Sequence, residues 1–548
     1  MPLGEHARRP PFRLFLVLGI LLVVFIALGT LVDLQREASE RRVTPGAGGA
    51  YGSTPVGQAG RCGDRPTTAI RELRGMWLTT VNNIDWPSQR GLDTETVKAE
   101  YRAWLDLAQQ YNHNAIFVHV RPSGDALWPS AYAPWSEWLT GRRDGQDPGW
   151  DPMEFMLTEA HARNLEFHAW MNPYRGAQPA TVGGPGGDVN QLAPNHPLRT
   201  HPEWAVIYPV GTTGSRFYFD PGIPEARRFV EDAMLEAVSK YDIDGLHFDD
   251  YFYPYPEAGQ DFDDNASFAR YGQGFANRAD WRRDNVNTLV REMNERIKAI
   301  KPWVKFGISP FGIWRNSETD SAGSATNGLQ SFDALYADTR KWVREGWLDY
   351  IVPQLYWHIG FDKADYAKLL PWWTEVVAGT KVQLYIGQAD YRVGEAGPWS
   401  DPGELDRQLN LNRQQKVSGS VHFSSKSIRN DKLGAASRYR AAYYAQPALV
   451  PPMAQLPANP PPAPEVLAVT RQDGGAVAVS WRPAADTATF AIYRAEATEA
   501  KLVGTVRSTG SGEQTWVDPA PGEATEYCVS ALDRSWNEGN VSEPSTID

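Results

Sequence analysis

Eight short apolar stretches recur along the middle of the chain, and each has the length of a β-strand. They are Leu73–Thr80, Ala115–Pro122, Glu166–Pro173, Gly245–Asp250, Lys305–Phe311, Tyr350–Trp357, Val382–Gln388 and Ser418–Ser424. Most are separated by segments of helical periodicity, such as Thr94–Gln110, Asp151–Ala162, Pro224–Lys240 and Ala279–Ile300. Alternation of strand and helix predicts parallel βα units. Units of this kind across residues 69–446 predict an α/β fold, a (β/α)8 TIM-type barrel with insertions.

The expected strands carry polar residues on one face near their carboxyl ends. The apolar series Ile116, Val118, Val120 and Phe167, Ala169, Met171 alternates with Phe117, His119, Arg121 and His168, Trp170, Asn172. Since strand side chains alternate between faces, helices cover the first series and the second faces the barrel interior. A doubly wound sheet would carry apolar residues on both faces, so the pattern favours a barrel.

Two further regions follow from composition and periodicity. Residues 447–464 contain Pro447, Pro451, Pro452, Pro457 and Pro460–Pro462, which predicts a semi-rigid linker. Residues 465–548 alternate with period two and predict an all-β domain that resembles a fibronectin type III sandwich, with Trp481 on an early strand and Tyr527 near a late one. The long segment 174–223 is expected to form a lid or cleft wall.

The amino-terminal region predicts export. Residues 14–32 carry no charge and follow three arginines, which predicts a transmembrane anchor with residues 1–13 in the cytoplasm. Residues 33–68 are then a flexible spacer to an extracytoplasmic enzyme domain. The alternative is a signal peptide cleaved near Ala27–Gly29, which would give a secreted protein.

Charge and cysteine content restrict the chemistry. The net charge of −12 argues against a nucleic-acid partner. The two cysteines, Cys62 and Cys528, fall in different predicted regions, so no disulfide is expected. No cysteine–histidine cluster has zinc-finger spacing, and we expect no cofactor. The 21 Trp and 23 Tyr fit either a large core or platforms for stacking sugar rings.

The most informative segment is Asp244–Pro254, a short strand that ends in two acids and an aromatic loop. Alternation places Asp249 on the inward face beside His247, at the carboxyl end of the strand, where TIM barrels carry catalytic groups. Asp250 either caps the following loop or turns back into the site. Both are candidate catalytic residues.

Cleavage of a glycoside requires a proton donor together with a nucleophile or a base. Asp125, in the loop after the second strand, is our candidate for the second acid, although it could also be a turn residue. Glu257, Asp261 and Asp390 are further candidates, whereas Asp85 is expected to be structural or to position substrate.

Several polar and aromatic residues are expected to bind substrate. The inward histidines could be partnered core residues or could hold a metal with Asp249, but their positions on neighbouring strands favour a polar pocket for hydroxyl and acetamido groups. The expected substrate-binding residues are His119, Arg121, His168, Asn172, His247, Tyr251, Gln354, Tyr356, Trp77 and Trp357. Trp314 is a further stacking candidate, and each Trp could equally pack in a wall.

The barrel region resembles the glycosyl-hydrolase-like 10 family of bacterial envelope proteins. The matching segments are Arg71–Thr79, Asn83–Pro87, His119–Leu127, His168–Arg175, Asp244–Pro254, Gly307–Arg315 and Pro353–Trp357. The resemblance implies a glycosidase-like barrel outside the cytoplasm, with an acid at Asp249 or Asp250 and an amino-sugar glycan such as peptidoglycan as substrate. The fibronectin-like domain would be a spacer or contact envelope proteins.

Two other functions remain open from the sequence. A non-catalytic glycan-binding protein would keep the groove without a working pair of acids. An enzyme on a related barrel would instead act on α-glucans, with no activity on amino sugars.

Overall fold

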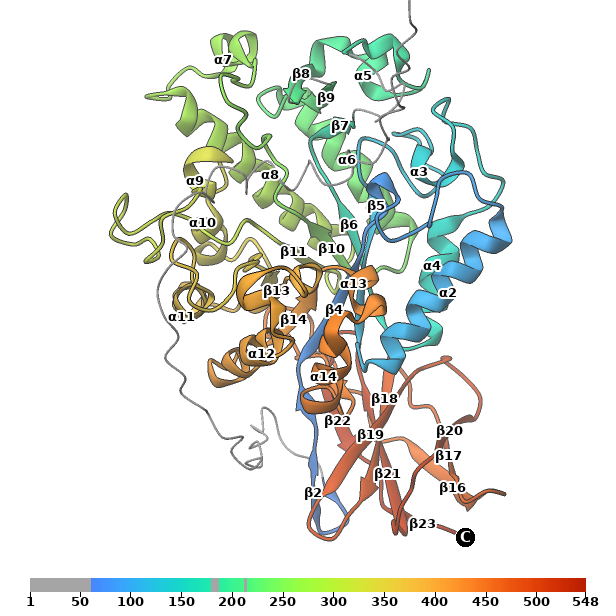
Figure 1. The fold of residues 1–548 in the computed structure, drawn as a ribbon. Coiled ribbons are helices and arrows are strands. Elements are labelled where there is room, and N and C mark those ends of the chain that lie inside the picture. The colour runs from blue at the N-terminus through green and yellow to red at the C-terminus, as the bar shows by residue number, and fades with distance from the viewer. Residues whose placement is uncertain (1–60, 179–186, 211–213) are drawn as a thin grey trace, which may run out of the picture. The chain divides into compact units, whose positions relative to one another are not determined.

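A closed eight-stranded parallel barrel forms the centre of the computed structural model, which describes residues 61–178, 187–210 and 214–548. Its strands are β4 (Leu73–Leu78), β5 (Ala115–Arg121), β6 (Glu166–Met171), β10 (Gly245–Phe248), β11 (Lys305–Ile308), β12 (Tyr350–Ile351), β13 (Gln383–Gln388) and β14 (Gly419–His422). β14 pairs with β4 and closes the ring (Figure 1). The predicted barrel is therefore confirmed.

Several barrel strands end earlier than the apolar stretches suggest. Pro122, Pro173, Pro310 and Pro353 lie one or two residues beyond the ends of β5, β6, β11 and β12. Because proline has no amide hydrogen to donate to the ladder, strand pairing stops there and the chain turns into a loop. These loops at the carboxyl ends carry the polar residues of the site.

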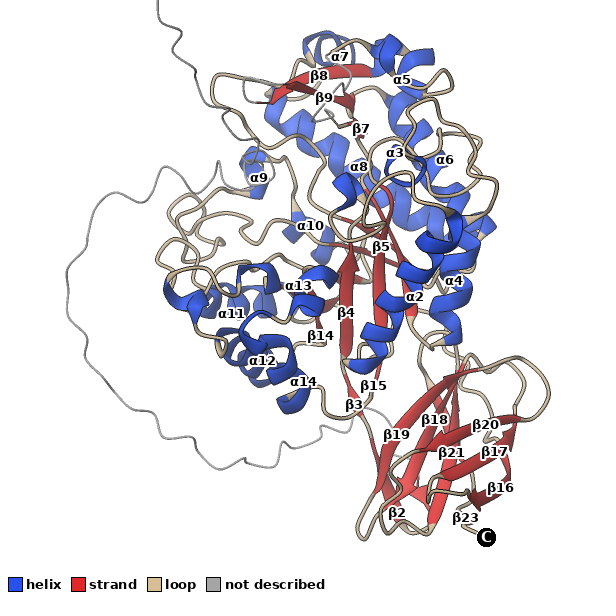
Figure 2. Ribbon diagram, turned by 45° about the vertical axis from the view of Figure 1, so that its right-hand side comes forward, coloured by secondary structure: helices blue, strands red, loops and turns tan. Residues whose placement is uncertain are grey.

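Helices surround the strands, as Figure 2 shows. The longer helices are α2 (Thr94–Gln110), α4 (Pro152–Ala162), α6 (Pro224–Lys240), α8 (Arg278–Ile300), α11 (Tyr366–Val377), α12 (Glu404–Gln414) and α14 (Ala435–Ala442). The shorter ones are α3 (Glu137–Thr140), α5 (Pro197–Thr200), α7 (Asn265–Tyr271), α9 (Ser331–Ala334), α10 (Thr339–Arg344) and α13 (Ser425–Asn430). Side-chain caps start several of them: Asp93 accepts from the Thr96 amide, and Asp151 accepts from the amide of Met153.

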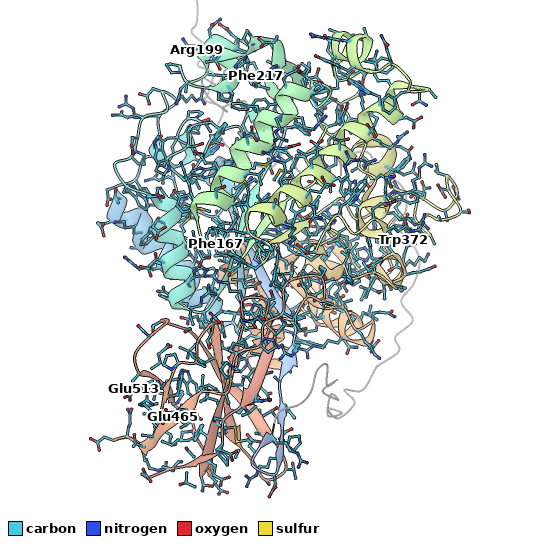
Figure 3. All side chains as sticks on the ribbon, turned by 180° about the vertical axis from the view of Figure 1, so that it is seen from behind. Phe167, Arg199, Phe217, Trp372, Glu465 and Glu513 are labelled. Carbon is cyan, nitrogen blue, oxygen red and sulfur yellow. A yellow bond between two sulfur atoms is a disulfide. The ribbon has the colours of Figure 1, made fainter. Side chains whose placement is uncertain are left out.

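The predicted inside and outside series occupy different cores. Ile116, Val118, Phe167 and Ala169 pack in the layer between strands and helices, where Figure 3 shows Phe167. Phe117 and Trp170 belong to a second buried cluster inside the barrel. The period-two alternation in the sequence therefore separates the two faces as expected.

The segment after β6 forms a small sheet at the carboxyl end of the barrel. It consists of β7 (Arg175–Ala177), β8 (Ala205–Val210) and β9 (Gly214–Phe219), in the order β7-β9-β8. In Figure 1 this sheet lies above the barrel strands. It thereby brings its first residue, Arg175, to the end of the barrel where the acids lie.

Two antiparallel-rich sheets form the C-terminal domain, so the expected all-β domain is present. One contains β16 (Glu465–Arg471), β17 (Val477–Arg482) and β20 (Gln514–Asp518). The other contains β18 (Thr489–Ala495), β19 (Ala500–Arg507), β21 (Glu526–Leu532), β22 (Glu538–Val541) and β23 (Ser545–Thr546). Trp481 and Tyr527 are both buried in the core between them.

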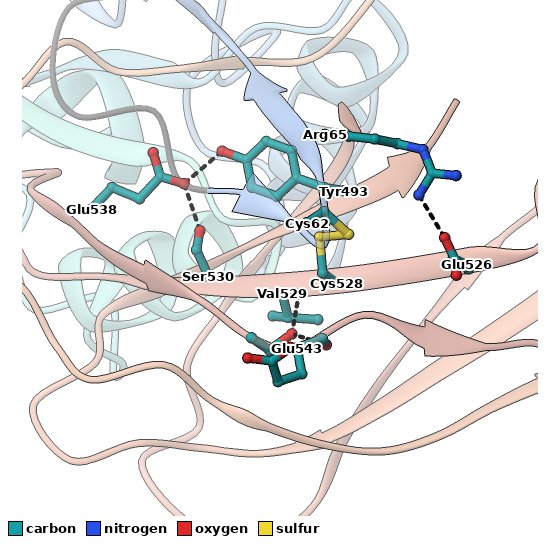
Figure 4. The surroundings of a disulfide bond; sticks show 10 residues. Cys62, Arg65, Tyr493, Glu526, Cys528, Val529, Ser530, Glu538 and Glu543 are labelled. Carbon is teal, nitrogen blue, oxygen red and sulfur yellow. Dashed lines mark hydrogen bonds and ion pairs between the residues drawn. A yellow bond between two sulfur atoms is a disulfide. The ribbon is translucent and has the colours of Figure 1, made fainter. Parts of the chain in front are cut away.

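The second sheet also recruits β1 (Arg61–Cys62) and β2 (Arg65–Thr68), from a stretch expected to be spacer. β2 pairs in parallel with β19, and Arg65 forms a 2.7 Å ion pair with Glu526. Cys62 and Cys528 form a disulfide in this sheet (Figure 4). The expectation of no disulfide was wrong, because separation along the chain does not limit which strands become neighbours in a sheet.

The proline-rich segment 447–464 packs beneath the barrel. β15 (Ala448–Leu449) pairs with β3 (Ile70–Arg71), and Leu449, Val450, Met453 and Leu456 are buried with interior barrel residues and with residues of the sandwich. The segment is therefore part of the core at the amino ends of the barrel strands.

The predicted membrane anchor at 14–32 lies outside the described residues. In the part of the chain that the structure describes, no helix has both the length and the apolar character needed to cross a membrane.

Candidate active site

Asp249 and Asp250 follow β10 directly, and each is only 4% exposed. The backbone N–H of Tyr251 donates to Asp249 Oδ1 over 3.1 Å. The hydroxyl of Tyr255 donates to Asp250 Oδ2 in a short hydrogen bond, and Gln354 also stabilises the charged form of Asp250. Asp250 thus turns back into the site, one of the two alternatives that the sequence left open.

The environments of the two acids favour different protonation states. Burial and the neighbouring charge of Asp250 raise the pKa of Asp249 to about 8, against the opposing effect of Arg175. Burial also raises the pKa of Asp250, but Tyr255, Arg175 and Gln354 pull it down. Because like charges this close resist joint ionisation, the pair holds one proton near neutral pH. Asp249 is the better proton donor and Asp250 the better carboxylate.

Arg175 is a site residue that the sequence prediction did not select. It begins β7 and is buried, and its guanidinium carbon lies 3.8 Å from the centroid of the Tyr251 ring. Its charge lowers the pKa of both aspartates. Its position at the end of the motif His168–Arg175, just past the third strand, was the available signal.

His119 lies flat against Trp170 on the neighbouring strand, with ring centroids 3.9 Å apart and planes 6° apart. Burial and the charge of Arg175 lower the pKa of His119 well below its ordinary value, so the ring is neutral. Neither of its ring nitrogens has a hydrogen-bond partner among the described residues. The Trp170 indole N–H and Asn172 Oδ1 are likewise unpartnered. Trp170 also lowers the pKa of Asp249, although the indole N–H is not in hydrogen-bond geometry with that carboxyl group.

Arg121 continues this polar layer from the end of β5. It is fully buried, and its Nη1 donates to the Asn172 carbonyl over 3.1 Å. Its Nε and Nη2 have no partner among the described residues. Asp125 accepts a hydrogen bond from the Ser123 amide over 2.8 Å. Burial raises the pKa of Asp125, and the charge of Arg121 opposes this rise. The structure therefore groups Asp125 with Arg121 and does not pair it with Asp249 by any hydrogen bond.

Three expected substrate-binding residues lie within the barrel with their polar atoms partnered. His168 contacts the Tyr350 hydroxyl through Nδ1 at 2.8 Å, and its Nε2 lies 3.0 Å from Glu166. It is level with Gly245, four residues before Asp249. His247 lies 3.0 Å from the Ser309 hydroxyl and accepts from the Trp77 indole. His168 therefore lies below the level of the two acids, whereas His247 is paired in register with Trp170 and the Trp77 ring centroid lies 6.1 Å from that of Phe423.

Three of the other candidate acids have side-chain partners away from the Asp249–Asp250 pair. Asp390 forms a 2.9 Å ion pair with His422, and Asp261 forms a 3.0 Å ion pair with Arg282. Asp85 accepts from the Thr79 amide, consistent with the structural role expected for it. The backbone amide of Glu257 donates to the Tyr208 hydroxyl. Asp249 and Asp250 are therefore the two candidate acids that interact with one another.

Half-buried aromatic residues follow one another around the two acids. The first series runs through Tyr251, Tyr255, Phe311 and Trp357, with neighbouring ring centroids 5.5 to 6.2 Å apart. A second group contains Tyr356, Tyr391 and Phe423, with centroids 5.7 to 6.0 Å apart. We call these seven residues the aromatic rim. Four of them, Tyr255, Phe311, Tyr391 and Phe423, were not selected from the sequence, although each lies just beyond a strand. Trp314 instead packs against Trp372 and donates to Asp338.

The barrel region matches a known protein family. The family model described as glycosyl hydrolase-like 10 matches residues 72–402, which is more than half of the chain. The chain belongs to the glycosyl hydrolase-like 10 family. This family region contains all eight barrel strands except β14, as well as both aspartates and most of the aromatic rim.

Two relatives extend the family assignment over most of the chain. The glycosyl hydrolase YngK of Bacillus subtilis is 47% identical over 489 residues, which cover 87% of this chain and 93% of YngK. The glycosyl hydrolase DigH of Escherichia coli is 38% identical over 445 residues, covering 77% of this chain and 95% of DigH. Membership of this family and these relatives support a glycosidase-like function.

Among solved structures, the PgaB (BpsB) glycoside hydrolase domain from Bordetella bronchiseptica is similar at a TM-score of 0.43 and 13% identity. The match covers 67% of this chain and 98% of that domain. A likeness of this degree carries no functional argument.

Proposed function

We propose that this family member is a glycoside hydrolase that cleaves an amino-sugar polysaccharide of the cell envelope, with peptidoglycan glycan strands as the first candidate. The observation that carries the proposal is the Asp249–Asp250 pair, in which one acid keeps its proton and the other is stabilised as a carboxylate. Hydrolysis of a glycosidic bond needs these two forms together.

The surrounding residues fit a sugar ligand. Asp249 would protonate the glycosidic oxygen, and Asp250 would stabilise positive charge that develops in the sugar ring. The aromatic rim offers apolar faces on which pyranose rings stack. The unpartnered groups of His119, Trp170 and Asn172 would exchange hydrogen bonds with hydroxyl or acetamido groups, which satisfies polar atoms that are otherwise buried alone.

The location of the protein is part of the same proposal. A segment at 14–32 with the composition of an anchor would hold the enzyme on the outer face of the membrane. The Cys62–Cys528 disulfide supports export, because disulfides persist in oxidising compartments. The two packed sheets of the C-terminal domain support a fibronectin type III-like assignment for that domain. This domain packs against the barrel through one end, and its other surfaces would be available to envelope proteins.

The test is incubation of the full-length protein with purified glycan strands, with and without stem peptides, followed by mass analysis of the products. We expect shortened glycans from the wild type and none from Asp249→Asn. Asp263→Asn is the matched control, since Asp263 is an exposed aspartate in the loop that follows. Undiminished turnover by Asp249→Asn would refute the role of Asp249.

The same experiment separates two other functions. Binding of glycan strands without shortening would indicate a non-catalytic glycan-binding protein. Cleavage of starch-like polymers with no product from amino sugars would indicate an α-glucan enzyme.

A further inference from the structure

The two acids of the site are consecutive residues at the end of a single strand. In glycosidases with an enzymic nucleophile, two carboxyl groups flank the scissile bond, because the nucleophile attacks from the side opposite the leaving group. Asp249 and Asp250 both reach the site from the end of β10, and they act on one another directly. A pair that shares one backbone segment approaches a bound sugar from one side.

Three of the other candidate acids, Asp390, Asp261 and Asp125, have partners of their own. Asp390 is ion-paired with His422, and Asp261 with Arg282. Asp125 accepts from the Ser123 amide and lies beside Arg121. None of these three has a hydrogen bond or ion pair to the Asp249–Asp250 pair among the described residues.

The wall beside Asp249 instead presents polar groups that lack partners. The Trp170 indole N–H can only donate, whereas Asn172 Oδ1 can only accept, and each ring nitrogen of neutral His119 can do one or the other. All are buried and none has a partner in hydrogen-bond geometry among the described residues, although Trp170 lowers the pKa of Asp249 and Asn172 opposes the lowering of the pKa of His119. An acetamido group needs this combination, a donor for its carbonyl oxygen and an acceptor for its N–H.

From this geometry we infer that the nucleophile is the 2-acetamido group of the substrate itself, oriented by Asp250 and by the polar groups around Trp170. The inference rests on the proposed glycosidase function and names its substrate class. The sugar on the non-reducing side of the cleaved bond must carry an N-acyl group at C2, and the product keeps the anomeric configuration of the substrate.

The reaction balances in two steps. First, the acetamido oxygen attacks C1 and the C1–O bond breaks, while protonated Asp249 gives its proton to the departing oxygen. Asp250, as a carboxylate, accepts the acetamido N–H and stabilises the positive charge of the cyclic oxazolinium. In the second step water attacks C1, ionised Asp249 takes a proton from the water, and the ring opens to restore the acetamido group. The net change is addition of one water molecule across the glycosidic bond.

A series of N-acyl substrates tests the role of the acetamido oxygen. Glycan oligosaccharides whose acetyl groups are replaced by fluoroacetyl, difluoroacetyl or trifluoroacetyl keep their size but have progressively weaker carbonyl nucleophiles. We expect kcat of the full-length protein to fall by about tenfold or more across the series, with KM changing less than about threefold. Equal kcat values throughout, or a product of inverted configuration, would overturn the inference and leave the hydrolase function standing.

Binding of a sugar-fused thiazoline tests the same point without turnover. This ring resembles the oxazolinium intermediate but is not hydrolysed, so its affinity can be measured by calorimetry on the protein itself. We expect binding to the wild type and to Asp263→Asn, and at least about tenfold weaker binding to Asp250→Asn. Hydrolysis of glycans without thiazoline binding contradicts only the inference and leaves the proposed hydrolase function standing. Thiazoline binding without hydrolysis of envelope glycans contradicts the proposed substrate and supports the inference.

Discussion

Trp536 of the C-terminal sandwich donates its indole N–H to Glu166 Oε1, 2.6 Å away at the base of the barrel. Glu166 is fully buried and also binds Lys305 and His168. Burial opposes ionisation of Glu166, but these cationic and hydrogen-bonding neighbours outweigh it and lower its pKa. The sandwich therefore completes the environment of an ionised group that belongs to the barrel.

The first prediction follows from this bond. Trp536→Phe keeps an aromatic ring but removes a donor from a buried carboxylate, which should cost about 1.5–3 kcal/mol in the free energy of unfolding. Urea denaturation measures the loss. Trp481→Phe is the control, because Trp481 is also buried in the same domain and its indole N–H has no partner within the described part of the chain. Equal losses in the two variants would show that the hydrogen bond to Glu166 adds nothing beyond ring packing.

The second prediction concerns the disulfide. Cys62 and Cys528 are separated by 466 residues, so the bond links both ends of the described chain through one sheet. A variant with both cysteines replaced by serine should lose about 2–4 kcal/mol of stability, mainly because its unfolded chain is less constrained. Unfolding with and without a reductant measures the effect. The reductant should lower the stability of the wild type and leave the double variant unchanged; no difference between the two proteins contradicts the prediction.

The sequence predicted the barrel well because each strand alternates two chemically different faces. It could also place Asp249, since alternation from Leu246 and Phe248 fixes its side of the strand. Alternation does not give height within the barrel, so His168 was expected at the mouth although it is level with Gly245. Contacts between distant segments were also not accessible, which is why Arg175 and the disulfide were missed. The direction of the Asp250 side chain depends on how the chain turns after β10. The alternation of strand residues ends before Asp250 and therefore could not predict it.

A third prediction uses the raised pKa of Asp249 and requires no substrate. A carboxyl group whose pKa is higher in the folded state stabilises the fold below its unfolded pKa, near 4, and this contribution is lost as the pH rises through about 8. Asparagine stays neutral throughout. Asp249→Asn should therefore gain stability relative to the wild type between pH 4 and pH 8. The expected gain is about 2 kcal/mol, which allows for the fact that Asp249 and Asp250 share one proton.

Thermal or urea unfolding across this pH range provides the measurement for Asp249→Asn. Asp263→Asn serves as the control, because Asp263 is exposed and accepts a hydrogen bond from the exposed side chain of Asn265. A constant stability difference between Asp249→Asn and the wild type from pH 4 to pH 8 would mean that Asp249 is not protonated by its environment.

The fourth prediction separates the two acids. Activity needs ionised Asp250 and protonated Asp249, so the pH profile of kcat should be bell-shaped, with Asp250 setting its acid limb. The Tyr255 hydroxyl donates to Asp250 and lowers the pKa of that group. Tyr255→Phe should therefore move the acid limb to higher pH, by about one unit, while the ring remains in the aromatic rim. Tyr391→Phe is the control, and a shifted acid limb in that variant but not in Tyr255→Phe would contradict the assignment.

The last prediction concerns Arg175, whose charge lies against Tyr251 and lowers the pKa of both aspartates. Arg175→Met keeps much of the side-chain volume but removes this charge, so both pKa values rise and the whole pH profile of kcat should move to higher pH by about one unit. Arg175→Lys retains a cation and loses the planar stacking on Tyr251, so its profile should stay close to that of the wild type. If Arg175 only supported the fold, both variants would lose activity without any shift. A profile that moves toward lower pH in Arg175→Met would contradict the electrostatic role, because removing a cation cannot make a neighbouring carboxyl group more acidic.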